Sequence, residues 1–121
     1  MSGTGKRAVR VADQVRQEIA TALVREMSDP HLANAVITRV EMTDDLQNAR
    51  IFVRLASTTD DEKARKGLLR SLHRASGSLR KLVGTALQLR RTPELKFFYD
   101  EGQDASDRVQ ALLSEIERER R

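Results

Sequence analysis

The sequence predicts an α+β domain of two layers, in which helices cover one face of a three-stranded sheet. Two observations lead to this class. Stretches with helical periodicity and stretches with strand-like alternation follow one another in the order helix, strand, strand, helix, helix, strand, helix. The chain has 121 residues, 39% of them hydrophobic, which suits one domain that buries roughly two thirds of its unfolded surface. A second domain has no room.

The first element is an amphipathic helix over residues 7–27. Its apolar residues recur at spacings of three and four, and they are Val11, Val15, Ile19, Ala22, Leu23 and Met27. Asp29-Pro30 should end this helix, because the residue before a proline is driven out of helical geometry. Residues 1–6 are small and polar, so we expect them to be disordered.

Two strands follow as a hairpin. Residues 36–43 and 49–56 both show the alternation of a strand. In the second run the residues that share one side are Ala49, Ile51, Val53 and Leu55. The polar link 44–48 is short enough to join the two runs as a hairpin.

A long helical stretch comes next. Thr59 and Glu62 have the spacing of a capping box at its start. One face of the stretch is apolar, with Leu68, Leu72, Ala75, Leu79, Leu82, Val83 and Ala86, and the opposite face is cationic, with Lys63, Lys66, Arg70, Arg74 and Lys81. Gly77 falls in the middle of the cationic face. Gly84 weakens the second half, and Thr92-Pro93 should end it.

The last two elements are a strand and a helix. Residues 94–100 form the third strand, with Leu95, Phe97 and Tyr99 facing inward and Lys96 and Phe98 facing outward. Asp104 and Asp107 have the spacing of a helix start. The apolar face of that helix consists of Val109, Leu112, Leu113 and Ile116. Residues 117–121 lack apolar side chains and should fray, so the folded domain is expected to span residues 7–116.

Positive charge is concentrated in one segment. From Lys63 to Arg91 the chain has nine cationic residues and no Asp or Glu, whereas the whole chain is only +4, which leaves −5 for the rest. Such a local field is the usual electrostatic footprint of a protein that binds phosphate backbones. The expected partner is therefore a polyanion, and nucleic acid is the first interpretation.

Other classes of function are disfavoured. The chain has no cysteine, hence no disulfide or thiolate zinc site, and we find no P-loop, GxSxG or HExxH motif. His31 and His73 lack a second metal ligand at suitable spacing, and the acidic pairs at 44–45 and 60–62 fit a turn and a helix start. We expect no enzyme activity, no metal, no cofactor and no small-molecule substrate. Without a secretion signal or a membrane span, the protein should be soluble and cytoplasmic.

The order of elements also matches KH-type nucleic-acid domains, in which a glycine-containing turn between two helices lets a sugar-phosphate backbone approach. At the level of residues the chain resembles the ribosome-binding factor A family over about residues 7–116. The resemblance is carried by Asp29-Pro30, Val40-x-x-x-x-Asp45-Leu46-x-x-Ala49, Leu89-Arg90-x-x-Pro93-Glu94-Leu95-x-Phe97 and Asp100. Each piece is a weak pattern alone, but their order and spacing together are specific.

The resemblance implies a type II KH-like fold in which the usual GxxG loop is replaced by an Ala-x-Gly kink, here Ala75-Ser76-Gly77. It also implies a bacterial, cytoplasmic factor that binds the free 30S subunit and assists late assembly and 16S rRNA maturation. We expect a monomer that does not bind membranes.

A mechanism for binding follows from the expected kink. Free amides there and the N-terminal end of the next helix would attract phosphate, with cations on both sides. The candidate RNA-binding residues are Lys66, Arg70, Arg74, Ala75, Ser76, Gly77, Arg80, Lys81, Arg90 and Arg91. Contacts of this kind go to phosphate and sugar, so specificity must come from RNA shape. Phe52 and Phe98 are the outward aromatic residues, and a terminal segment more often covers such rings than RNA does.

Three alternatives to the ribosome remain open. The basic face could be a solvated helix surface, or it could hold an acidic protein partner. The protein could also be a generic KH-type RNA chaperone without preference for the ribosome. A metal-dependent nuclease that uses the acidic pairs is disfavoured, because those acids lie in separate loops.

Overall fold

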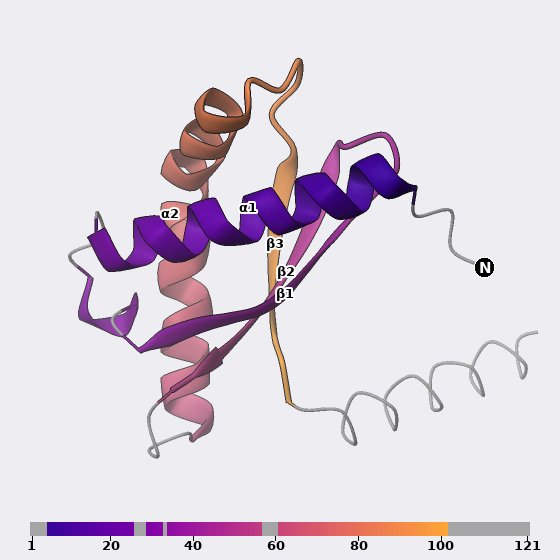
Figure 1. Cartoon of the computed structure of the whole chain (residues 1–121). Helices are drawn as coiled ribbons and strands as arrows, with labels where there is room; N and C mark the ends of the chain where they lie inside the picture. The colour runs from indigo at the N-terminus through magenta and orange to yellow at the C-terminus, as the bar shows by residue number, and fades with distance from the viewer. Residues whose placement is uncertain (1–4, 26–28, 33, 57–60, 102–121) are drawn as a thin grey trace, which may run out of the picture.

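The computed structural model describes residues 5–25, 29–32, 34–56 and 61–101. Their elements are α1 (Lys6–Arg25), a short 3-10 helix η1 (Pro30–Leu32), β1 (Ala35–Met42), β2 (Asn48–Leu55), α2 (Glu62–Leu87) and β3 (Glu94–Tyr99). The sheet has the order β1-β2-β3, with β1 antiparallel and β3 parallel to β2. Figure 1 shows α1 crossing both the sheet and α2. The predicted α+β class is confirmed.

Both helices pack on the same face of the sheet. Ile19 of α1 and Leu72 of α2 are fully buried, and both belong to one core cluster with Ile51 of β2. The alternation predicted for the second strand is confirmed, because Ala49, Ile51, Val53 and Leu55 are all buried. The opposite face of the sheet, which carries Phe52 and Phe98, points away from this core.

The first strand departs from simple alternation. The pairing register with β2 shifts between Ile37 and Arg39, so Thr38 forms a bulge. As a result the core-facing residue is Ile37 before the bulge and Val40 after it. The Thr38 hydroxyl lies 2.6 Å from Oδ2 of Asp100, which ties β1 to the residue after β3.

The predicted bounds of the helices need small corrections. Helix α1 begins at Lys6, one residue earlier than expected, and ends at Arg25. The N-cap of α2 is Asp61, whose carboxylate accepts a 2.8 Å hydrogen bond from the amide of Ala64. Helix α2 ends at Leu87, ahead of Thr92-Pro93, because Gln88 adopts a left-handed conformation with φ 51°. Four predictions fall outside the described residues. They concern the disordered N-terminus up to residue 4, the capping role of Thr59, the last helix and the frayed tail.

The largest correction concerns the kink predicted at Ala75-Ser76-Gly77, because the expected division into two separate helices there is wrong. Helix α2 is continuous over 26 residues, and these three residues are helical. A helical glycine costs only about 1 kcal/mol relative to alanine, whereas Leu72 and Leu79, on either side of Gly77, are fully buried in the core. Packing of the apolar face therefore keeps the helix intact. Figure 1 shows its later turns leaning away from the line of its earlier turns, so the helix bends without breaking.

Candidate nucleic-acid interface

A stripe of exposed cations runs along α2. The residues follow one another at spacings of three, four or seven, which places them on one side of a helix. We call Lys63, Lys66, Arg70, Arg74 and Lys81 the α2 cationic stripe. All five are exposed. At a rise of 1.5 Å per residue the stripe is about 27 Å long, so it could follow several nucleotides of an RNA backbone.

Gly77 leaves an open place in the middle of the stripe. It is exposed, and a Cβ atom added to it would meet nothing within 4 Å. Because the residues around it are helical, their amides belong to the helix and the predicted phosphate site on free amides is not formed. The side chains, together with the bare backbone at Gly77, are what this surface can offer to an anion.

Most of the charge in the stripe is not neutralised by the protein. Lys66 pairs with Glu62 at 3.3 Å, but both side chains are highly exposed, and such pairs contribute little. Lys63, Arg70 and Lys81 make no ion pair with any residue that the structure describes. The stripe therefore presents free positive charge to solvent.

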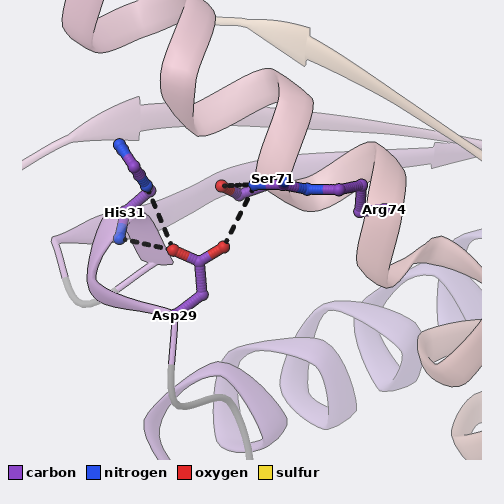
Figure 2. Close-up of polar contacts among 4 residues, drawn as sticks. All are labelled: Asp29, His31, Ser71 and Arg74. Carbon is purple, nitrogen blue, oxygen red and sulfur yellow. Dashed lines mark hydrogen bonds and ion pairs between the residues drawn. The ribbon is translucent and has the colours of Figure 1, made fainter.

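Arg74 is the best positioned member of the stripe. One of its guanidinium nitrogens lies 3.6 Å from Oδ2 of Asp29 and 3.4 Å from the hydroxyl of Ser71 (Figure 2). Asp29 also accepts hydrogen bonds from the amide of His31 at 2.9 Å and from its ring Nδ1 at 3.1 Å. The amide of His31, followed by the hydroxyl of Ser71, lowers the pKa of Asp29 below its usual value. The ionised carboxylate thus holds the segment after α1 against α2 and orients Arg74.

The predicted site residues do not all lie in one place. Arg80 is half-buried and donates to the carbonyl oxygens of Pro93 at 3.0 Å and Thr92 at 3.3 Å. It therefore connects α2 to the start of β3 rather than facing solvent with the stripe. Ala75 packs against the core, and the hydroxyl of Ser76 donates to the carbonyl of His73 at 2.7 Å.

Arg90 and Arg91 belong to a second basic area. They follow α2 and line a hollow of about 470 Å³ together with Arg7 at the start of α1. Asp45 lines the same hollow. The role of Arg7 could not be decided from the sequence, because no local pattern shows that the start of α1 meets the segment after α2.

The described part of the chain offers no sign of other chemistry. No group of three or more His, Cys, Asp or Glu side chains among the described residues could hold a metal ion. None of the described helices is long and apolar enough to cross a membrane. What the arrangement can do chemically is bind an extended polyanion through phosphates, without reading sequence.

Comparison with known proteins points to one family. The family model for ribosome-binding factor A matches residues 7–113. A ribosome-binding factor A from Sorangium cellulosum is 47% identical over 116 residues, which are 96% of this chain and 93% of that relative. A candidate ribosome-binding factor A from Thermotoga maritima, solved by NMR, has a TM-score of 0.68 and 25% identity, covering 85% of this chain and 94% of that one.

A second similar structure comes from a complex. It is a homology model of Thermus thermophilus ribosome-binding factor A fitted into the cryo-EM map of a 30S complex. Its TM-score is 0.61 at 23% identity, covering 75% of this chain and 92% of that one. At this identity the likeness shows a shared fold.

Proposed function

Because this chain belongs to the ribosome-binding factor A family, we propose that it binds the free 30S ribosomal subunit and assists late 30S assembly and 16S rRNA maturation. It acts in the cytoplasm as a monomer. The binding partner is 16S rRNA, which the protein contacts through the α2 cationic stripe. The Thermus thermophilus relative that was fitted into a 30S complex supports this choice of partner.

The observation that carries the proposal is the unneutralised stripe around Gly77. Lys63, Arg70 and Lys81 have no ion-pair partner among the described residues, so their charges are available to phosphates. Binding of each phosphate releases condensed counterions, which makes affinity depend steeply on salt. An acidic protein partner could satisfy the same charges, but it would lack a regular row of phosphates.

Gly77 explains how RNA could approach the helix closely. A side chain at this position would stand between the cations and the ribose-phosphate backbone. Without it, the arginine and lysine side chains on either side can reach phosphates while the backbone rests against the helix surface. Since such contacts position RNA without reading its bases, selectivity for the small subunit comes from RNA shape.

Cosedimentation with purified ribosomal particles tests the proposal. The protein should pellet with free 30S subunits, and an excess of unrelated structured RNA should displace it poorly. If unrelated RNA competes as well as free 30S subunits do, the protein is a general RNA binder and the proposed function is wrong. A separate experiment tests the maturation role. Cells that lack the protein should accumulate the 16S rRNA precursor.

A further inference from the structure

A row of three flat groups crosses the outer face of the sheet. Arg39, Phe52 and Phe98 lie opposite one another in the pairing registers of β1, β2 and β3. The guanidinium carbon of Arg39 is 3.9 Å from the centre of the Phe52 ring. The rings of Phe52 and Phe98 are stacked, with centres 5.5 Å apart and planes inclined by 29°. The row is thus a continuous stack that begins at β1 and ends at β3.

The stack is open at the Phe98 end. Phe98 is 41% exposed although it is a large apolar residue, and it lies on β3, which is an edge strand of the sheet. The core of the domain lies on the other face and gains nothing from this ring. An exposed aromatic face at the end of a stack is suited to one more flat ring.

Cations surround the open end. Arg54 lies two residues after Phe52 on β2, and Lys96 lies two residues before Phe98 on β3, so both share the face of the rings. The side chains of both are exposed and make no hydrogen bond or ion pair with the described residues. They are positioned to neutralise the phosphates of a strand that passes Phe98.

The acids on this face each lie close to a partner within the protein, and Glu94, two residues before Lys96, lies 3.9 Å from Arg80. Glu41 lies 3.3 Å from Arg39 and 3.9 Å from Arg50. Asp100 faces the hydroxyl of Thr38 at 2.6 Å. The charge that remains unpaired on the outer face is therefore positive, which favours an anionic ligand. A ligand that also has a ring to stack is favoured over an acidic segment of protein that has none.

We propose that the outer sheet face is a second RNA site, at which an unpaired base of a single-stranded segment stacks on Phe98 while Lys96 and Arg54 hold its flanking phosphates. Aromatic and cationic groups in this combination bind single strands without reading sequence. The inference rests on the proposed RNA partner, but it uses a different surface. The α2 cationic stripe belongs to the helical layer, so the protein would contact RNA on both of its layers.

A single-stranded RNA decamer with one 2-aminopurine tests the proposal, because stacking quenches the fluorescence of this base. Full-length protein should quench it. Phe98→Leu, which keeps an apolar side chain, should weaken binding by roughly 5- to 100-fold, whereas Phe98→Tyr should retain it. Lys96→Gln should reduce the slope of log affinity against log salt by about 0.7. Circular dichroism and thermal unfolding of each variant check the fold.

Two results would overturn the proposal. One is an unquenched decamer with the wild-type chain, which is also the result expected if residues 102–121 cover Phe98. The other is equal binding by Phe98→Leu and wild type. The variant Arg70→Gln with Lys81→Gln separates this site from the proposed function, since it should bind 30S subunits roughly 25-fold more weakly and still quench the decamer. Quenching by a protein that never pellets with 30S subunits would leave this site in place and refute only the proposed function.

Discussion

Removing two cations from the α2 cationic stripe should weaken 30S binding by a calculable amount. Arg70 and Lys81 are the best choice, because both are exposed and neither pairs with a described residue. Glutamine at both positions keeps a good helix former. We therefore expect the free energy of unfolding to change by no more than about 0.5 kcal/mol.

The size of the binding effect follows from counterion release. Each phosphate contact to irregular RNA contributes about 0.7 to the slope of log affinity against log salt, so five cations give about −3.5. The variant Arg70→Gln with Lys81→Gln should lower this to about −2.1. At about 0.1 M salt the two missing contacts correspond to roughly 25-fold weaker binding, or about 2 kcal/mol.

The assay is cosedimentation with free 30S subunits over a series of KCl concentrations. A matched control carries Arg10→Gln with Arg25→Gln, which removes the same net charge from exposed positions on α1. The control should keep the wild-type slope. If both double variants reduce the slope equally, binding depends on net charge alone, and the assignment of the stripe as the contact surface is refuted.

Three further predictions concern glycines and one acid. Gly77→Ala and Gly77→Leu should each raise the free energy of unfolding, measured with urea, by up to about 1 kcal/mol, because a Cβ there meets nothing within 4 Å. Gly77→Leu should nevertheless lose 30S binding. Binding that survives in Gly77→Leu would contradict the close approach of RNA to the helix. Gly84→Ala should stabilise the protein less than Gly77→Ala does, by about 1 kcal/mol or more, since its Cβ would lie 2.7 Å from Oγ1 of Thr92. This difference in the free energy of unfolding should shrink in a Thr92→Ala background. A difference that persists there has another cause. The hydroxyl of Thr43 is the main reason that the pKa of Asp45 lies below 3.8, so in acid the unfolded chain takes up the proton first; the stabilisation from Asp45 is full above about pH 5 and is lost as pH falls through 3.8 and below. Thermal unfolding should be measured from pH 6 to pH 2.5. The melting temperature should fall less steeply with falling pH in Asp45→Asn than in wild type, and an equal dependence on pH would argue against this role.

Periodicity predicted the order of elements because burial is decided locally along each helix and strand. The inward set on β2 followed from spacing alone, and so did the apolar face of α2 except for Ala86, which is exposed near the end of the helix. Alternation failed at Thr38, because the run of β-branched residues around it suits either face and only pairing with β2 shows the bulge. The break at Gly77 was wrong for a related reason, since a glycine lowers local helix stability by less than the core packing of Leu79 restores.

The candidate site was predictable in its charge but not in its partners. The stripe follows from helical spacing, whereas the contact of Arg74 with Asp29 and the turn of Arg80 toward Pro93 join segments distant in sequence. The stack of Phe52 on Phe98 depends on the parallel register of β2 and β3. No local pattern specifies that register.

Directed hydroxyl-radical probing tests most directly whether the exposed face of α2 meets 16S rRNA. The chain has no cysteine, so Ser78→Cys, beside Gly77 and exposed, gives a unique attachment point for an iron chelate. Gln14→Cys on the exposed side of α1 is the control position. We predict strong, localised cleavage of 16S rRNA in 30S complexes from position 78 and weaker cleavage from position 14. Cleavage from position 14 alone, or from neither position in a complex that still pellets, would contradict the account.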